Sequence, residues 1–370
     1  MPVHYHTGKF PPRNLDWEAI AGPLTHATDS IARYDSFLGI IPDAHILISP
    51  LTTQEAVTSS RIEGTHATVG DVLAYEAGSH AVDPAKRDDV QEVVNYQVAI
   101  RHAERLLETL PLSGRILRSA HEILLHEVRG QYKSPGKYRT EQNWIGRSYD
   151  ISEARYVPVA PDEVEPAMAQ WEQFVNLSEM PPLVKTSIAH AEFESIHPFL
   201  DGNGRIGRMI IPLMLYADGV MSHPCFYLSE FFEHRNDEYQ DRLLAVSRDD
   251  DWTGWCVFFL NAMDQQAREN NDKARRIYSL YERTRDELSE RSGSPSAGRV
   301  VRELFRAAIF RSTDLTKTEG VNPKTARRLL NALKEMGTVR ELEAASGSRP
   351  AIYMFPELIE ITEGIEFSRG

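Results

Sequence analysis

Residues 196–208 read Ile-His-Pro-Phe-Leu-Asp-Gly-Asn-Gly-Arg-Ile-Gly-Arg, and this stretch decides the fold of the chain. Before it, residues 183–196 carry apolar side chains at helical spacing, and Pro198 prevents a regular continuation of that helix. After the glycine-rich turn, Arg205 opens a second apolar run that also predicts a helix. The stretch therefore predicts two helices joined by a loop whose backbone can approach a ligand closely.

The loop and the start of the second helix carry groups that bind phosphate. Free N–H groups at the start of the helix that follows the glycine-rich turn can form an anion hole. Arg205 and Arg208 are three residues apart, so they share a helix face and can hold the same polyphosphate. These residues together predict a site for a phosphate chain.

Two further groups in the same block favour a chemical reaction over simple binding. His197 lies near the helix end and can be neutral near pH 7, so it can accept a proton from an attacking hydroxyl. Asp201 offers a hard oxygen of the kind that holds Mg²⁺ against phosphates. A lone histidine is more often structural, and Asp-Gly-Asn-Gly alone is usually a turn. Their combination predicts transfer of a phosphorus group.

The block resembles the signature of the Fic family, His-Pro-Phe-x-Asp-Gly-Asn-Gly-Arg-x-x-Arg, and every fixed position from His197 to Arg208 is filled. The resemblance implies a protein adenylyltransferase, which moves AMP from ATP to a Ser, Thr or Tyr hydroxyl of a protein and releases pyrophosphate. It also implies the following roles: His197 as base, Asp201 as Mg²⁺ ligand, Gly202, Asn203 and Gly204 as anion hole, and Arg205 and Arg208 on the outer phosphates.

A helix predicted over 52–63 and ended by Gly64 carries a second motif. Ser59-x-x-x-Glu63-Gly64 is similar to the inhibitory motif of the family, Ser/Thr-x-x-x-Glu-Gly/Asn, whose glutamate pairs with the last arginine of the signature. Here that pair would be Glu63 and Arg208, so the carboxylate would compete with phosphate oxygens. A charge-assisted pair of this kind contributes about 1.5–3 kcal/mol. The motif implies an enzyme that inhibits itself in cis.

Turn-forming residues alternate with short β-branched and aromatic runs near 143–158, which predicts a β-hairpin. In the family the corresponding segment is a flap that aligns the extended backbone of the target by strand addition, and here it would include Arg155, Tyr156 and Val157. An ordinary hairpin is the alternative. Relatives also place an aromatic ring against the purine, and Tyr239 is the candidate, although an aromatic at helical spacing is usually part of the core.

Helical periodicity covers most of the remaining chain and predicts a mainly α protein with three parts. We expect an N-terminal helical region with the inhibitory motif over 1–110 and a Fic catalytic core over 111–291. A linker rich in Ser, Gly and Pro then begins at Ser292 and leads into a C-terminal domain over 292–370.

The C-terminal domain resembles a winged helix, with predicted helices at 299–310, at 313–315 and at 322–333, followed by a two-stranded wing. The third helix would be the recognition helix, with Pro323 in its first turn. It is basic, through Lys324, Arg327, Arg328 and Lys334, and this admits DNA as a partner. Winged helices also dock proteins or dimerise, so a protein partner and a homodimer are equally open.

Composition narrows the class of protein. The net charge of −13 argues against a surface that coats nucleic acid generally. The N-terminus lacks the basic start and apolar run of a signal peptide, and no long apolar stretch predicts a membrane span, so we expect a cytoplasmic protein without a membrane partner. Cys225 and Cys256 are too few for a disulfide framework or a thiolate zinc site.

Three alternatives to adenylylation remain open. Some Fic proteins transfer a different group, and others remove AMP, with the inhibitory glutamate positioning water. Relatives that phosphorylate carry a lysine at the position of Gly204, so this glycine favours AMP transfer. From another class, the chain would be a DNA-binding regulator whose Fic core senses a nucleotide.

Overall fold

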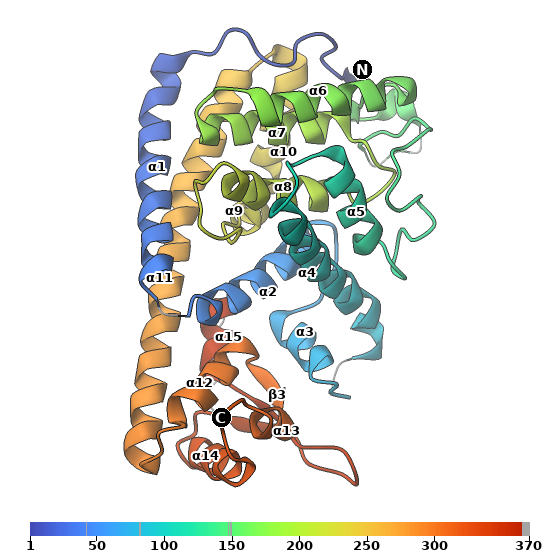
Figure 1. Cartoon of the computed structure of the whole chain (residues 1–370). Helices are drawn as coiled ribbons and strands as arrows, with labels where there is room; N and C mark the ends of the chain where they lie inside the picture. Colours follow the sequence, from blue (N-terminus) through green and yellow to red (C-terminus); the bar gives the residue numbers. More distant parts are fainter. Residues whose placement is uncertain (42, 81–82, 147, 149, 365–370) are drawn as a thin grey trace. The chain divides into compact units, whose positions relative to one another are not determined.

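A computed structural model describes residues 1–41, 43–80, 83–146, 148 and 150–364 (Figure 1). Within them the chain is mainly helical and contains two small sheets. It divides into two compact units: one comprises Met1–Ser36, Thr58–Thr65 and Val94–Glu269, and the other comprises Phe37–Val57, His66–Val93 and the chain from Asn270 onward. The division at 110 and 291 expected from the sequence stays a prediction.

The first unit is built around helix α7 (Pro182–Ile196). This helix packs against α6 (Val164–Leu177) on one side and α8 (Asn203–Ala217) on another (Figure 1). Thirteen of its fifteen residues are buried, because neighbouring helices cover it on several faces. The unit also holds α5 (Gly114–Leu124), α9 (Ser229–His234), α10 (Asn236–Asp249) and parts of α1 (Trp17–Ile40), α2 (His45–Ile62), α4 (Arg87–Leu107) and α11 (Trp252–Ser292).

The signature forms the predicted helix, loop and helix. α7 ends at His197, whose backbone is left-handed (φ 50°), and Pro198 follows it. Gly202, also left-handed (φ 78°), precedes the first turn of α8, where the absence of a side chain makes this conformation inexpensive. The loop from 197 to 202 is therefore short and held by a fixed backbone conformation at each end.

The segment near 143–158 differs from a regular hairpin. Antiparallel pairing among its described residues is a single bridge between Ile145 and Tyr156, and a 3₁₀ turn lies at Ile151–Glu153. Strand β2 (Tyr156–Val157) pairs instead in parallel with β1 (Val3–His4), a strand that the sequence did not predict. A buried contact between His6 and Glu192, 2.8 Å apart, fixes the chain just after β1.

The second unit contains α3 (Val69–Glu76) and the C-terminal domain. That domain comprises α12 (Ala297–Arg306), β3 (Ile309–Arg311), α13 (Ser312–Thr316), α14 (Pro323–Glu335), β4 (Arg340–Glu343), β5 (Ile352–Met354) and α15 (Pro356–Glu363). Its antiparallel sheet has the order β3-β5-β4. Three helices and this sheet form the arrangement expected of a winged helix.

Two details of the C-terminal domain differ from the sequence analysis. The first helix was expected to reach Phe310, but the chain leaves the helix after Arg306 and forms β3, whose Ile309 and Phe310 are buried against β5. A β-branched and an aromatic residue suit a half-buried strand, and pairing with a distant strand outweighed the local helical period. The second is α15, which the sequence analysis did not predict.

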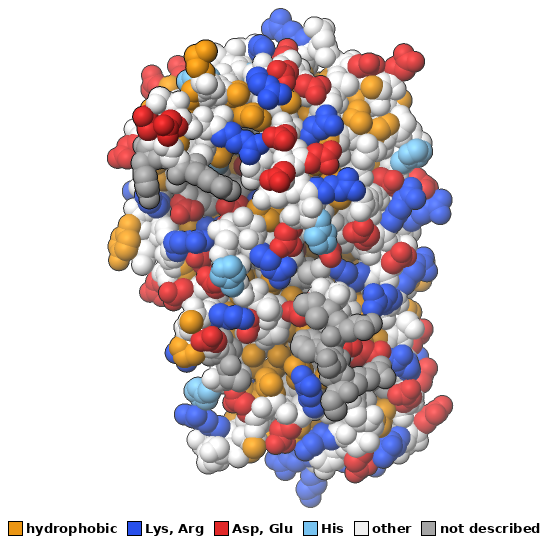
Figure 2. All heavy atoms as spheres, turned by 180° about the vertical axis from the view of Figure 1, so that it is seen from behind, with side chains coloured by type: hydrophobic (Ala, Val, Ile, Leu, Met, Phe, Trp, Pro, Cys, Tyr) orange, Lys and Arg blue, Asp and Glu red, His pale blue; other side chains and the backbone are white. Residues whose placement is uncertain are grey.

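The helices, the surface charges and the thiols of the described residues bear on the expectations drawn from composition. Within the described part of the chain, no helix combines the length and the apolar character that crossing a membrane requires. On the face in Figure 2, basic and acidic side chains are interspersed. Cys225 and Cys256 are both buried and both free.

Candidate active site

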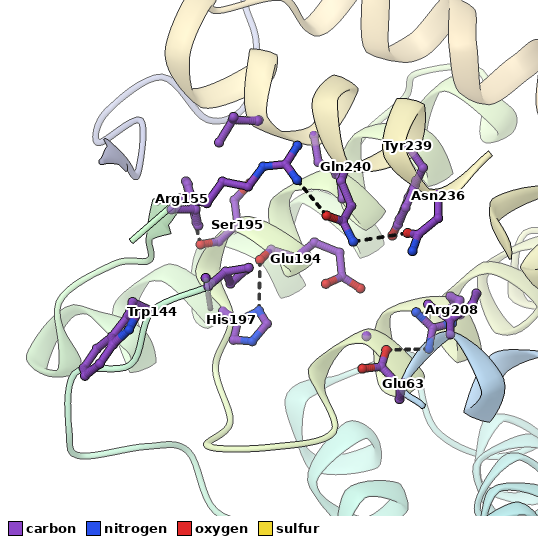
Figure 3. Close-up of a pocket in the computed structure, with 17 residues that line it drawn as sticks. Glu63, Trp144, Arg155, Glu194, Ser195, His197, Arg208, Asn236, Tyr239 and Gln240 are labelled. Atoms are coloured by element: carbon purple, nitrogen blue, oxygen red, sulfur yellow. Dashed lines mark hydrogen bonds and ion pairs between the residues drawn. The ribbon is translucent and has the colours of Figure 1, made fainter. Parts of the chain in front are cut away.

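A pocket of about 400 Å³ opens beside the loop between α7 and α8 (Figure 3). Its walls come from the end of α2, the 144–156 segment, the last turn of α7, the start of α8, and α10, all within the first unit. The lining residues that the following argument uses are Glu63, Arg155, Tyr156, Glu194, His197, Gly204, Arg208, Asn236, Tyr239, Leu243 and Leu244. The pocket therefore brings both sequence motifs to one place.

Arg139 fixes the backbone at His197. Its side chain is buried, and its Nε donates a hydrogen bond of 2.9 Å to the carbonyl of His197. Its Nη2 donates to the carbonyls of Ile196, at 3.3 Å, and of Val159. Carbonyls at the end of a helix lack intrahelical partners, so this guanidinium satisfies them and holds the histidine in place. Arg139 was not predicted from the sequence, because no local pattern distinguishes it from a surface arginine.

The imidazole of His197 is arranged to accept a proton. Its Nδ1 lies 3.4 Å from the carbonyl of Glu194, and because a carbonyl only accepts, Nδ1 carries the hydrogen. Nε2 is then the basic nitrogen. Burial lowers the pKa of His197 to about 4, so the ring is neutral at pH 7. This is the protonation state that a general base requires.

The start of α8 presents N–H groups to the pocket. The first hydrogen bond of the helix runs from the N–H of Ile206 to the carbonyl of Gly202, at 3.1 Å, so the N–H groups of Asn203 and Gly204 lie at the open end. The Asn203 side chain has a different role, because it accepts from the N–H of Phe199 and donates to its carbonyl, both at 2.8 Å. It closes the loop, and only its backbone is available to an anion.

His121 on α5 positions the loop at Asp201. The N–H of Gly136 donates to Nδ1 of His121 at 2.9 Å, so Nε2 carries the hydrogen and donates to the carbonyl of Asp201, also at 2.9 Å. The ring stacks on Phe199 at 3.8 Å, and burial lowers the pKa of His121 to about 4. His121 was not predicted from the sequence, because it lies 80 positions before its partner.

The carboxylate of Asp201 suits a magnesium ion that is held mainly by a nucleotide. Its Oδ1 is 3.5 Å from Nη2 of Arg205, and its side chain remains 35% exposed, whereas Arg205 is buried. No group of three or more His, Cys, Asp or Glu that could hold a metal occurs in the described residues. Mg²⁺ commonly binds proteins through one or two carboxylates and takes its other ligands from phosphates and water. The donor set therefore fits such an ion.

The two motifs meet at Arg208. The Nε of this buried arginine donates to the Ser59 hydroxyl at 2.9 Å, and its Nη2 donates to the Ser59 carbonyl and to Oε1 of Glu63, both at 2.8 Å. Burial alone would raise the pKa of Glu63, but the charges of Arg208 and Arg205 and the hydrogen bond from Arg208 outweigh it, so the pKa lies below its usual value. Glu63 is therefore ionised, and the predicted pair is present (Figure 3).

Gly204 lies directly under this pair. A side chain at this position would collide with Oε1 of Glu63 and would come within 2.9 Å of Nη1 of Arg208. Both atoms are the ends of flexible side chains, so a larger residue at 204 would require these ends to move from their observed positions.

The predicted flap residues divide between two places. Nη1 of Arg155 donates to Oε1 of Gln240 on α10 at 2.9 Å, and the Tyr156 hydroxyl donates to the carbonyl of Ser195 at 3.0 Å. Both line the active-site pocket. Val157 lines a different pocket, of about 380 Å³. Strand addition of a target needs a free edge of β2, and β1 already occupies one of its two edges. Docking of a target at Val157 stays a prediction.

Tyr239 reaches the pocket but is held as a core residue. Nδ1 of His190 lies 2.9 Å from the carbonyl of Gly207 and must donate to it, so the Tyr239 hydroxyl donates to Nε2 of His190, at 2.8 Å. The Tyr239 ring stacks on Phe232 at 4.3 Å. It forms part of the pocket wall, and its role in binding a base stays a prediction.

Comparison with family profiles finds two adjacent matches. The profile of the Fic/DOC family N-terminal region matches residues 22–105, and that of the Fic/DOC family matches residues 111–215. The second match contains the signature, and the first contains the Ser59–Gly64 motif.

Curated relatives match less than half of the chain. Protein adenylyltransferase fic-1 of Caenorhabditis briggsae is 25% identical over an alignment of 170 residues, and the match covers 43% of this chain and 30% of that protein. Protein adenylyltransferase Fic of Drosophila ananassae is 25% identical over 162 residues, or 43% and 31% of the two chains. The match thus spans less than a third of the length of these relatives.

Solved structures resemble more of the chain. A Fic family protein from Desulfovibrio desulfuricans superimposes with a TM-score of 0.61 at 23% identity, over 93% of this chain and 98% of that one. A Fic domain containing signaling protein from Bacteroides thetaiotaomicron gives a TM-score of 0.55 at 19% identity, over 69% and 98%. At these identities the likeness concerns the fold.

Proposed function

Since the chain belongs to the Fic/DOC family and is distantly related to Fic protein adenylyltransferases, we propose that it transfers AMP from ATP to a hydroxyl group of a protein. The observation that carries the proposal is the filled signature, in which a neutral histidine, an anion site and a buried arginine line one pocket. The adenylyltransferase names of the matched relatives support the same reaction.

The proposed reaction is a displacement at the α-phosphorus of ATP. The oxygen of a Ser, Thr or Tyr hydroxyl bonds to this phosphorus, the bond to the pyrophosphate oxygen breaks, and Nε2 of His197 takes the hydroxyl proton. The N–H groups of Asn203 and Gly204 would hold phosphate oxygens as charge develops on them. Mg²⁺ at Asp201 would supply positive charge to the leaving pyrophosphate.

We assign the control of this activity to Glu63. Its carboxylate occupies Nη2 of Arg208, a donor that an outer phosphate would otherwise use. Ser59 holds the same guanidinium from α2, so the inhibitory helix engages it at two residues. A nucleotide must displace Glu63 before it gains Arg208, and the protein would therefore show little activity until Glu63 moves away.

Removal of AMP is the alternative reaction at the same site. There a water molecule would replace the target hydroxyl, and Glu63 would orient it. Gly204 argues against kinase-type transfer, because the resemblance implies a lysine at this position in relatives that phosphorylate. DNA binding through exposed Lys324, Arg327 and Arg328 on α14 stays a prediction, as does a homodimer.

Intact-mass spectrometry of the Glu63→Gly variant after incubation with ATP and Mg²⁺ tests the proposal. Adenylylation predicts an adduct with the mass of AMP on the protein itself or on proteins of an added cell lysate. An adduct with the mass of a phosphate would establish a different reaction. If no adduct forms, while AMP is released from a pre-modified protein, the chain removes AMP.

A further inference from the structure

Glu194, on the last turn of α7, lines the pocket, and its side chain has no part in the reaction above. Its Oε1 is buried and has no hydrogen-bond partner within the described residues. The carboxyl group lies against the backbone of α8, because a side chain added at Gly207 would collide with Oε1. A buried oxygen without a partner costs about 1–3 kcal/mol, so its presence calls for a reason beyond packing.

The position of Glu194 is central in the pocket. In Figure 3 its carboxyl group points between Arg208 and Glu63 on one side and Asn236 and Tyr239 on the other. The first side, with Arg208, is the phosphate end. The second side continues along α10 to Leu243 and Leu244, which make that wall apolar; these two residues line the same pocket.

A nucleoside triphosphate has the same order of chemical groups. Its phosphates need cations and N–H donors, its flat base suits an apolar wall, and its ribose lies between them with two neighbouring hydroxyl groups. A carboxylate accepts hydrogen bonds from such hydroxyls, as acidic residues do in dinucleotide-binding folds. Phosphate is a poor partner for an ionised Glu194, because both groups are negatively charged and a carboxylate only accepts hydrogen bonds.

We propose that Glu194 binds a ribose hydroxyl of the nucleotide and thereby selects ribonucleotides over deoxyribonucleotides. The inference rests on the proposed function, since it takes ATP to be the ligand. Burial and the charge of Glu63 raise the pKa of Glu194 to about 7, even though Arg208 opposes the shift. A hydroxyl that donates to the carboxyl group would supply the partner that its buried oxygen lacks.

The test compares the affinities of ATP, 2′-deoxy-ATP and 3′-deoxy-ATP. Titration calorimetry on the Glu63→Gly protein should show at least one deoxy analogue binding about 10- to 150-fold more weakly than ATP, the loss expected for one hydrogen bond to a charged group. In the Glu63→Gly background, Glu194→Ala should bring the three affinities within about twofold. The Glu194→Gln variant keeps the size and one acceptor oxygen, so it should keep part of the preference.

Glu238→Gln serves as the matched control, because Glu238 is an exposed glutamate of α10 outside the pocket lining and should leave the preference unchanged. Equal affinities for all three nucleotides in the Glu63→Gly protein would overturn the inference without any change at Glu194. A preference that survives Glu194→Ala would overturn it as well. If none of the three nucleotides binds, both the proposed function and this inference fail. Equal binding of all three overturns the inference alone, so the two failures are distinguishable.

Discussion

Replacing Glu63 perturbs the contact on which the regulatory proposal depends. Glu63→Gly removes the carboxylate from Arg208, whereas Glu63→Gln keeps the shape and removes the charge. The Arg208 side chain is 2% exposed and that of Glu63 is 35% exposed, with 2.8 Å between Nη2 and Oε1. Such a pair lies between a buried charged hydrogen bond, at about 1.5–3 kcal/mol, and an exposed ion pair, at about 0–1 kcal/mol.

An intermediate value of about 1–2 kcal/mol corresponds to about 5- to 30-fold in the population of the competent state. We expect the initial rate of self-modification, at ATP below saturation, to rise by that factor in Glu63→Gly. The rise should be smaller in Glu63→Gln, because an amide still accepts a hydrogen bond from Arg208.

Glu233→Gln is a suitable control for this experiment. Glu233 on α9 forms an ion pair of 3.4 Å with Arg61, which lies near the end of α2. Loss of the Glu233 charge therefore disturbs the end of α2 without removing a partner of Arg208. Rates that are equal in the wild type and in Glu63→Gly would refute the reasoning. An equal rise in Glu233→Gln would show that loosening of the helix, and not loss of the carboxylate, is the cause.

Three further predictions concern other parts of the molecule. Burial lowers the pKa of His121 to about 4, so the stability that this group contributes is present above pH 6.5 and is lost as pH falls toward 4. Urea unfolding should show that the free energy of unfolding falls by about 2–3 kcal/mol over this range because of His121. This pH-dependent loss should be smaller in His121→Asn. Because the pKa of Glu194 is raised to about 7, wild-type stability falls as pH rises from 4.5 to 7. Glu194→Gln should therefore be more stable than the wild type by about 2–3 kcal/mol at pH 8 and by little at pH 4.5. If α14 binds DNA, the full chain should retard duplex fragments at low salt, and Arg327→Ala with Arg328→Ala should weaken this binding; no retardation by the wild type would contradict it.

The sequence predicted those parts of the site that are local in the chain. Residues 197–208 define their own geometry, since Pro198 stops one helix and Gly202 starts the next. The pair of Glu63 and Arg208 spans 145 positions, and only the resemblance to a known motif connected them. Without that motif, Glu63 would read as an exposed residue at a helix end.

The parts that the sequence did not predict depend on contacts between distant segments. His121 and Arg139 donate hydrogen bonds to backbone carbonyls. Every residue has a backbone carbonyl, so the sequence does not indicate which one accepts. Strand β1 forms because a two-residue segment near the N-terminus pairs with β2, more than 150 positions later in the chain. Glu194 lies within a run of helical period, and its unpartnered oxygen became apparent only once α8 was placed against it.

The central claim is AMP transfer by His197 under the control of Glu63, and one measurement tests it directly. ATP labelled at the α-phosphate or at the γ-phosphate is incubated with wild type, Glu63→Gly and the double variant Glu63→Gly with His197→Ala. The account predicts protein-bound label from the α position only, strongest in Glu63→Gly and absent in the double variant. Label from the γ position, or α label that persists without His197, would contradict it.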